Sequence, residues 1–536
     1  MKRQLWLRRK KTAPELPLEP PLRLGNMSNG EYFHESTPTE QRVRAEILRQ
    51  ADEKARKLGV DRREFLASAA GMATSLSVLN MVTGCASEDT GKRSGGFADL
   101  GRRGDGAPSS GNARASAYQI PEEATMDCGV AEQILGGKEF IFDMQTHHIE
   151  EEGEWRKTNP SNAEGLAFYF SQYNGCKKPD RKDCVNAEAY LDLIFVNSDT
   201  TVAVLSGFPA PLCTPKRTTG CGNSLDNDAM VRSRNHVNTV ANSQRVVQHC
   251  QVNPTDELEL QLDAMSRISE EFKCHGFKCY PEWGPAGKGW LLTDEDSGVP
   301  MIERARALNN KIICAHKGIV FEGWDPVAGH PRDMGLSAVR YPDTAFITYH
   351  SAMELEARGE GPYNPDNTLG VDRLCRTAEE FGLKGKNLYA ELGSVWATVM
   401  NNPIVAQHVI GKLVKYVGED NVVWGSECVW LGSPQAQIEA FRTFQITPEF
   451  QERYGYPELT PQIKAKIFGL NAAKVYNIDV EATRCRVAKT PTAMRKAELD
   501  AEVGNRRWVF DLPGGPRTRR EFFNFKRTTG NSPFQG

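Results

Sequence analysis

Short apolar runs, rich in β-branched and aromatic residues, recur along the middle of this 536-residue chain, and several end in a side chain that can bind a metal ion. Parallel strands of a closed barrel carry such groups at their C-terminal ends, where they line the mouth. The repeated placement therefore constrains the fold and predicts a divalent-metal site in a barrel mouth. The candidate groups are His147, His148, His316, His350 and Glu427.

From Gly137 onward the apolar runs alternate with longer segments of helical period, which is the pattern of repeated β-α-β units. The sequence predicts an α/β fold, a (β/α)8 TIM barrel with long loops on the C-terminal face and with N- and C-terminal extensions. The expected strands are 140–145, 201–205, 245–252, 276–280, 311–315, 345–349, 387–392 and 421–425. The expected helices are 187–196, 257–272, 301–308, 371–381, 404–417 and 461–476.

Two of the expected connections are long, residues 153–186 and 207–244. Both follow strands, so they should lie on the C-terminal face, where loops form the substrate pocket of a barrel. Their composition predicts a partly apolar, aromatic mouth for a small-molecule substrate; the alternative is a lid that only covers the barrel. The residues concerned are Trp155, Phe168, Tyr169, Phe170, Tyr173, Pro209, Pro211, Met230 and His236.

The composition excludes other classes of protein. A net charge of −3 gives no basic field for a nucleic-acid partner, and 39% hydrophobic residues suffice for a barrel of about 250 residues plus extensions. We divide the chain into a polar leader (1–58), a signal-like segment (59–87), a flexible linker (88–130), the barrel (131–480) and a C-terminal extension (481–536). Aromatic clusters in that extension predict a surface segment or a homodimer contact.

The signal-like segment contains the pair Arg62-Arg63 ahead of an apolar stretch from Ala69 to Val82. This arrangement resembles a twin-arginine export signal, and the residues leading to Cys85 resemble a lipoprotein cleavage box. The stretch is shorter than the span of about 20 residues that crosses a bilayer. The expectation is an exported protein, periplasmic or membrane-anchored outside the cytoplasm through a lipidated Cys85. The alternative is a short amphipathic helix with an incidental arginine pair.

Two pairs of cysteines lie in loop-like sequence, Cys176 with Cys184 and Cys213 with Cys221. In an oxidising compartment outside the cytoplasm each pair could form a disulfide. The alternative is four free thiols, because sequence alone does not set the connectivity of cysteines.

Several motifs together resemble the amidohydrolase-related family, which includes metal-dependent hydrolases and decarboxylases of the aminocarboxymuconate-semialdehyde type. The resemblance covers residues 138–478 and implies a barrel enzyme with a divalent ion, zinc most often and manganese as a possibility. The motifs are Asp143 to His147, Cys314-Ala-His316, Thr348-Tyr-His350, Trp424-Gly-Ser-Glu427 and Ile467 to Tyr476.

By this resemblance the expected metal ligands are Gln145, His147, His316 and Glu427, and the expected catalytic residues are His350 and Glu427. In the family the first strand carries Asp-x-His-x-His and the eighth carries Gly-Ser-Asp. This chain departs from both motifs, with Gln145 in place of a histidine and Glu427 in place of an aspartate. An amide oxygen binds metal more weakly than imidazole does, so the site is either retuned or has lost its ion.

Further side chains have secondary roles in this interpretation. We expect His148 to point away from His147, because alternate residues of a strand face opposite sides. Asp143 is expected beneath the site as a partner of the ligands. Lys278 is either a carbamate ligand, as in two-metal relatives, or a buried partner of Glu391. For Lys317 and Arg340 the hypothesis is contact with an anionic substrate, against a surface position for Arg340.

The predicted function is a metal-dependent hydrolase in which activated water attacks an amide, ester or lactone carbonyl. Two alternatives remain open: a nonoxidative decarboxylase of an aromatic or muconate-like acid, and a catalytically silent binding barrel.

Overall fold

The structure is a computed structural model and describes residues 19–28, 33–84, 116–150, 153–158, 181–222, 224–284, 287–321, 323–354, 360–503 and 520. Its centre is one parallel sheet of eight strands in sequential order from β3 to β10. The strands are β3 (Phe142–Thr146), β4 (Val202–Leu205), β5 (Val246–Gln251), β6 (Gly276–Cys279), β7 (Ile312–His316), β8 (Ala345–Tyr349), β9 (Leu388–Glu391) and β10 (Val422–Val423). All eight predicted strands are present, within a few residues of their expected bounds.

Backbone hydrogen bonds between the first and last strands close the sheet. Met144 N donates to Trp424 O at 2.9 Å, and Glu427 N donates to Gln145 O at 2.9 Å. A parallel bridge between Thr146 and Cys428 continues the same pairing. The predicted (β/α)8 TIM barrel is therefore confirmed, and closure brings the first and eighth strand ends into direct contact.

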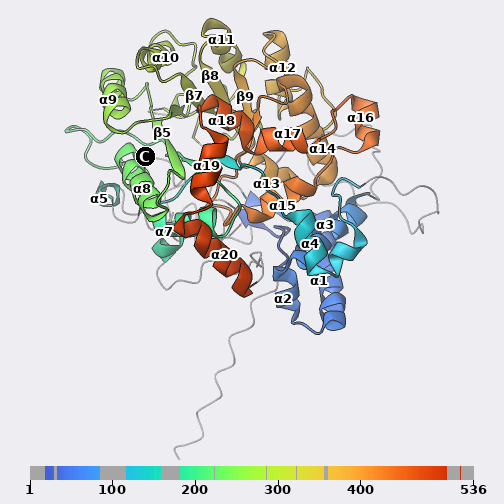
Figure 1. Ribbon diagram of the computed structural model, residues 1–536. Helices are drawn as coiled ribbons and strands as arrows, with labels where there is room; N and C mark the ends of the chain where they lie inside the picture. Colours follow the sequence, from blue (N-terminus) through green and yellow to red (C-terminus); the bar gives the residue numbers. More distant parts are fainter. Residues whose placement is uncertain are drawn as a thin grey trace, which may run out of the picture.

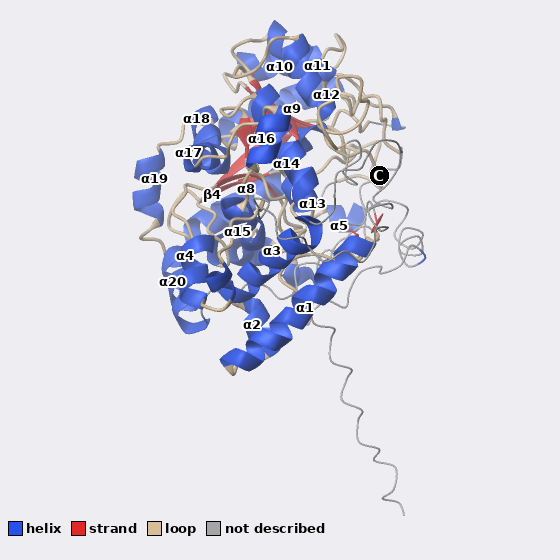
Figure 2. Ribbon diagram, turned by 90° about the vertical axis from the view of Figure 1, so that its right-hand side faces the viewer, coloured by secondary structure: helices blue, strands red, loops and turns tan. Residues whose placement is uncertain are grey.

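Helices surround the barrel on its outside (Figures 1 and 2). Those of the barrel are α7 (Ala187–Leu191) with η4 (Asp192–Val196), α8 (Asn227–Val240), α9 (Leu258–Glu271), α10 (Gly298–Ala307), α11 (Arg332–Arg340), α12 (Asp372–Glu380), α13 (Val395–Val399), α14 (Pro403–Lys412) with η7 (Leu413–Val417), α15 (Gln435–Thr443), α16 (Pro448–Tyr454), α17 (Pro461–Ala465), η8 (Lys466–Leu470) and α18 (Asn471–Val475). The remaining short elements on this body are α5 (Trp155–Thr158), η3 (Arg181–Cys184) and η6 (His350–Ala352).

Helix α8 corrects the sequence analysis, because it lies inside the segment 207–244 that we expected to be loop. The helix buries Met230 and Val237 against the barrel, seven residues apart and therefore on one face. His236 lies on this helix, is exposed and pairs with Glu188, so it does not line the mouth. The residues Phe168, Tyr169, Phe170 and Tyr173 of the other long connection lie outside the described residues.

Three N-terminal helices pack together beside the barrel and join its apolar core: α1 (Pro38–Leu58), α2 (Arg62–Ala67) and α3 (Ala69–Gly84). They follow a small hairpin of β1 (Met27–Ser28) and β2 (Phe33–His34), and they pack with η2 (Glu122–Thr125) and α4 (Cys128–Leu135). Figures 1 and 2 both show α1, α2 and α3 together on one side of the molecule. The polar leader of the sequence analysis thus contains an ordered amphipathic helix, whose buried residues are Val43, Ile47, Ala51 and Ala55.

Helix α3 is the apolar stretch of the signal-like segment, and it is buried in the fold. Met72, Ala73, Leu76 and Leu79 have no exposed surface. The side chain of Asn80 pairs with the backbone of Tyr118 in both directions, at 2.7 and 3.0 Å. Within the described residues, no helix combines the length and apolar character needed to cross a membrane.

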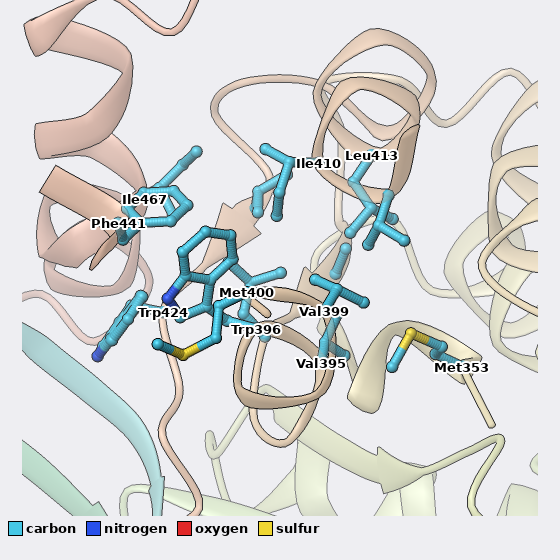
Figure 3. Close-up of a cluster of buried hydrophobic side chains, with 14 of the residues drawn as sticks. Met353, Val395, Trp396, Val399, Met400, Ile410, Leu413, Trp424, Phe441 and Ile467 are labelled. Carbon is cyan, nitrogen blue, oxygen red and sulfur yellow. The ribbon is translucent and has the colours of Figure 1, made fainter. Parts of the chain in front are cut away.

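The barrel and its outer helices share a large apolar core, part of which is drawn in Figure 3. There Trp424, at the end of β10, lies near Phe441 of α15 and Ile467 of η8. The indole of Trp396 on α13 donates to Gln437 O at 2.9 Å, which ties the helix after β9 to α15. This packing fixes the ends of β9 and β10, which carry residues of the mouth.

The C-terminal extension continues as α19 (Val480–Val487) and α20 (Pro491–Val503) on the barrel surface. Arg245, at the start of β5, donates to the hydroxyl of Thr492, which attaches α20 to the barrel. Of the predicted disulfides, Cys213–Cys221 is present and Cys184 is disulfide-bonded. Residues 88–115 of the linker, Cys85, Cys176 and the aromatic clusters after residue 503 lie outside the described residues.

Candidate metal and catalytic site

Strand ends bring four of the predicted site residues together. Gln145 and His147 end β3, His350 follows β8 and Glu427 follows β10. The side-chain nitrogen of Gln145 lies 3.4 Å from His147 Nε2, 3.5 Å from His350 Nε2 and 3.3 Å from Glu427 Oε1. His350 Nε2 and Glu427 Oε1 are 3.9 Å apart. These four side chains therefore meet at one point of the barrel mouth, as a shared metal site requires.

Backbone carbonyls fix the tautomers of both imidazoles. His147 Nδ1 lies 2.6 Å from Ser206 O, and His350 Nδ1 lies 2.9 Å from Gly393 O. A carbonyl only accepts, so each Nδ1 carries the proton and each Nε2 presents a lone pair. Two imidazole lone pairs and one carboxylate oxygen thus face the same point, toward which the amide nitrogen of Gln145 donates.

Unusual backbone conformations hold two of these groups. His350 has a φ of 58° and Glu427 a φ of 60°, in the left-handed region that non-glycine residues rarely adopt. Ser351 and Ala352 share this conformation, with φ of 48° and 58°. Such strain persists only where the surrounding structure imposes it, and it gathers at functional sites.

Gly393 leaves the space that Gln145 fills. A Cβ at this position would lie 2.2 Å from Gln145 Oε1 and 2.6 Å from Glu391 Oε1. The carbonyl of the same residue orients His350, and its N–H donates to Glu391 at 2.5 Å. The sequence analysis missed this glycine, since only the folded barrel shows which side chains approach it.

His316, the fourth expected ligand, lies beside the cluster rather than in it. Its ring centroid is 4.7 Å from that of His350, edge to face, and its Nδ1 is 3.2 Å from Glu282 Oε1. Asp143 lies beneath the site as expected and accepts from the backbone N–H of Ser426 at 2.9 Å. Glu282 and Glu391 are buried carboxyls of the mouth that the sequence analysis did not assign to the site.

Burial shifts the pKa values of these groups toward their neutral forms. Burial lowers the pKa of His147 to about 3 and that of His350 well below its usual range. Burial and the nearby Glu391 carboxyl raise the pKa of Glu427 to about 8. Burial raises the pKa of Glu391 to about 8 and that of Asp143 to about 7. The imidazoles are neutral near pH 7, as metal ligation or base catalysis requires.

The donor types of this cluster fit a divalent cation. Three lone-pair atoms face one amide group, whose Oε1 is buried and has no hydrogen-bond partner in the described part of the chain. Imidazole nitrogen with carboxylate and amide oxygen is a set that zinc and manganese both accept. Within the described ranges, no three or more His, Cys, Asp and Glu side chains are arranged to hold an ion by themselves.

Aromatic rings form the wall above the cluster. The indole of Trp430 lies parallel to the His147 ring at 5.6 Å, and the Phe208 ring lies 5.0 Å from the same imidazole. On the other side Tyr280 stacks on His316 at 4.9 Å, and Trp324 meets its edge at 5.7 Å. The wall is aromatic, but its rings are not those of the residues that we expected to form it, and only Phe208 comes from one of the two long connections.

The remaining predicted residues have mixed outcomes. His148 points away from His147, as expected, and its ring lies 5.8 Å from that of Tyr190. The expected contact of Lys317 with substrate is wrong, because its ammonium is buried on Asp333 and Ala328 O. Arg340 is a surface residue paired with Glu295. Lys278 is buried but forms no ion pair with Glu391.

Solved structures with a likeness to this chain are barrel enzymes of low sequence identity. 5-Carboxyvanillate decarboxylase from Sphingomonas paucimobilis is 14% identical, with a TM-score of 0.40 over 64% of this chain and 100% of that one. A probable 2-pyrone-4,6-dicarboxylic acid hydrolase from Acinetobacter baumannii is 11% identical, with a TM-score of 0.38 over 63% and 99%. 5-Carboxyvanillate decarboxylase from Novosphingobium aromaticivorans, solved with manganese, is 14% identical, with a TM-score of 0.40 over 64% and 97%.

No curated protein sequence matches this chain. A family model does match, and the match begins in α8. It is shorter than the resemblance described in the sequence analysis, because it leaves out β3 with Gln145 and His147. His316, His350 and Glu427 lie within it. Residues 228–478 match the amidohydrolase family model, and this match confirms the expectation of an enzyme.

Proposed function

We propose that this chain is a metal-dependent hydrolase that acts on a small amide, ester or lactone. The observation that carries the proposal is the approach of His147 Nε2, His350 Nε2 and Glu427 Oε1 to the Gln145 amide, each within 3.5 Å. Gln145, His147 and Glu427 would hold the ion, with His316 beside them. A bound divalent ion lowers the pKa of water and polarises a carbonyl oxygen, which is the chemistry a hydrolase needs.

His350 is the proposed proton carrier. Its Nδ1–H is anchored on Gly393 O, and its Nε2 lone pair faces the cluster. Because burial keeps the imidazole neutral near pH 7, this nitrogen can take a proton from the attacking water. It can return the same proton to the leaving group, so that the residue ends the cycle as it began.

Zinc is the ion we propose first, with manganese second. Neutral imidazole from His147 favours zinc, whereas the oxygens of Gln145 and Glu427 favour a harder ion such as manganese. The neighbour from Novosphingobium aromaticivorans was solved with manganese. The choice between the two ions is open to direct elemental analysis of protein purified without chelator.

A nonoxidative decarboxylase is the second candidate, and a specific observation favours it. The carboxyl of Glu427, with a pKa of about 8, carries a proton at neutral pH when no cation is bound. It lies in a mouth walled by Trp430 and Phe208, which suits a flat, unsaturated acid. In that reaction the ring carbon that bears the carboxylate would accept a proton from Glu427. Its bond to the carboxylate carbon then breaks, the electron pair of that bond returns to the ring and restores its aromaticity, and neutral carbon dioxide leaves.

The test combines metal content with turnover on two panels, one of esters, lactones and amides and one of aromatic acids. Zinc or manganese near one equivalent, with hydrolysis that chelation abolishes, supports the first function. Release of carbon dioxide without hydrolysis supports the second. A protein that binds neither ion and turns over neither panel is a silent barrel, and both proposals would be abandoned.

His350→Gln is the decisive variant for the proton role. General acid–base groups contribute about 10²–10⁴-fold in rate, so kcat should fall by that factor. His148→Gln is the matched control, because His148 adjoins His147 but packs on Tyr190. Full turnover by the His350 variant would refute the assignment.

We also propose that the chain is exported, with Cys85 as a possible lipid tether. The supporting features are the Arg62-Arg63 pair at the start of α2, the apolar α3 that follows and the Cys213–Cys221 disulfide, which suits an oxidising compartment. Because α3 is buried in the folded chain, export by this route requires the helix to leave its site. Cell fractionation with the mass of the mature protein tests this. A chain beginning at Cys85 outside the cytoplasm supports it, and a full-length cytoplasmic chain overturns it.

A homodimer through the C-terminal extension is a further proposal, which rests on the aromatic clusters in that part of the sequence. Light scattering on the full chain and on a chain ending at residue 480 tests it. A full chain that is monomeric would end the proposal.

A further inference from the structure

Lys278 is a buried cation without an ion-pair partner among the described residues. It lies on β6 with no exposed surface, and its Nζ has no hydrogen-bond partner in the described part of the chain. Burying an ammonium group that is neither paired nor solvated destabilises a protein. Groups that break this rule are expected at functional sites, where a ligand supplies the missing partner.

Two aromatic rings surround the ammonium and hold it in place. Lys278 Nζ lies 3.3 Å from the centroid of Tyr349 and 4.7 Å from that of Tyr280. Both rings are fixed by their own hydroxyls: Tyr349 donates to Met144 O at 2.7 Å and Tyr280 donates to Gly207 O at 3.0 Å. Cation–π contact retains the charge but satisfies none of its three N–H donors.

Lys278 lies beside the candidate site, because Tyr349, whose ring it contacts, directly precedes His350. Burial is the main cause of the low pKa values of His147, His316 and His350, and the nearby charge of Lys278 lowers them further. Tyr280, which it contacts, stacks on His316. The ammonium is therefore close to the metal-ligand cluster and to the aromatic wall, on the inside of the barrel.

We propose that Lys278 is a specificity-determining residue that binds a carboxylate of the substrate. This proposal takes the position of the active site from the proposed function. It adds that the substrate carries a carboxylate, which Lys278 binds. One ammonium matches one negative charge. The Tyr280 and Tyr349 rings would flank the carboxylate carbon.

The experiment measures binding of two probes of the same shape, benzoate and its neutral counterpart benzamide. Calorimetry on the full-length protein, as purified and again after chelation, gives both dissociation constants. We expect benzoate to bind at least about tenfold more tightly than benzamide in both states. Benzoate would accept a charge-assisted hydrogen bond from Lys278, whereas in the benzamide complex the charge of the ammonium would stay unpaired. Since the preference does not need the ion, the result is independent of whether the metal-dependent function holds.

Lys278→Met keeps the length of the side chain and removes the charge. We expect the ratio of the two dissociation constants to fall to about one in this variant. Lys288→Met is the matched control, because Lys288 is exposed on the loop after β6, and it should keep the preference. We also expect an unchanged or higher Tm for Lys278→Met, since a buried unpaired charge is lost; a purely structural lysine would give a lower Tm.

Three results would overturn the proposal: equal binding of benzoate and benzamide by the unaltered protein, retained preference in Lys278→Met, or loss of preference in the Lys288 control as well. A carbamate on Lys278 would reverse its charge and give the first of these results.

Discussion

The substitution Leu76→Ala tests whether α3 is a permanent part of the fold or a segment that only directs export. This side chain has no exposed surface and lies in the middle of α3. The helix contacts α1, α4 and the barrel helix α14. Leu76→Ala removes three carbon atoms from this packed site without changing polarity or helix propensity, so it isolates the contribution of packing.

The expected loss of stability follows from the burial of the residue. Three buried carbons contribute about 2.4 kcal/mol of transfer free energy, at about 0.8 kcal/mol each. The cavity left behind adds to this loss, and Leu→Ala changes at fully buried positions cost about 2.7–5.0 kcal/mol in total. We therefore expect the free energy of unfolding to fall by about 3–5 kcal/mol.

The assay is urea unfolding of the full-length protein, with tryptophan fluorescence and proteolysis of the N-terminal helices as separate probes. Met81→Ala in the same helix is the matched control, because Met81 is 49% exposed and should change the free energy of unfolding by less than about 0.5 kcal/mol. If Leu76→Ala unfolds at the same urea concentration as Met81→Ala, α3 is not packed as described and its burial cannot oppose export.

Three further predictions concern the site and the pH dependence of stability. Gly393→Ala should lower metal affinity at least about tenfold in a metal titration, because a Cβ would lie 2.2 Å from Gln145 Oε1. Gly361→Ala is the control and should leave the affinity unchanged, because a Cβ there would have no atom within 4 Å. Gln145→Glu brings a second carboxylate to 3.3 Å from Glu427 Oε1, where repulsion is at most about 5 kcal/mol at an effective dielectric constant of 20. At pH 9, above the Glu427 pKa of about 8, we expect the Tm of Gln145→Glu to be lower than that of the unaltered protein in chelator and higher in saturating manganese. A Tm that is lower in both conditions, or higher in both, would refute the ligand set. Burial lowers the pKa of His408 to about 3, so the unfolded chain takes up its proton below about pH 6.5 while the folded chain does not. This group therefore costs no stability above pH 6.5, and at pH 5 it lowers the free energy of unfolding by about 2 kcal/mol. In His408→Gln, unfolding curves should show a loss of stability between pH 6.5 and pH 5 that is smaller by this amount. An equal loss in the variant and the unaltered protein would contradict the assignment.

The strands of the barrel were predictable because their signals are local. Each is a short run of β-branched and aromatic residues with its own boundary, and the alternation with helical segments fixes the topology. Helix α8 was missed because its polar sequence buries few side chains, Met230 and Val237 among them. Helix α1 was missed for the same reason: its buried stripe is made of Val43, Ile47 and two alanines within a strongly charged segment.

The site was predictable only in the residues that end strands. His147, His350 and Glu427 could be named because the ends of parallel strands meet at one face, and Gln145 could be named only through the resemblance to a family motif. Gly393, Trp430 and Lys278 could not be assigned, because their roles depend on what other segments bring against them. Lys317 illustrates the same limit, since its pairing with Asp333 on α11 is set by the fold and not by its position beside His316.

The sequence by itself determined the barrel and the chemical types at its mouth, because strand period and strand termination are properties of neighbouring residues. Only the tertiary structure decided that Gln145 lies at the meeting point of two imidazoles and a carboxylate, and that His316 lies beside it. It also decided that the apolar stretch of α3 is buried core and that Lys278 has no hydrogen-bond partner in the part of the chain that the structure describes. These facts depend on distances of a few ångströms between strands and helices far apart in the chain, which closure and packing of the barrel fix.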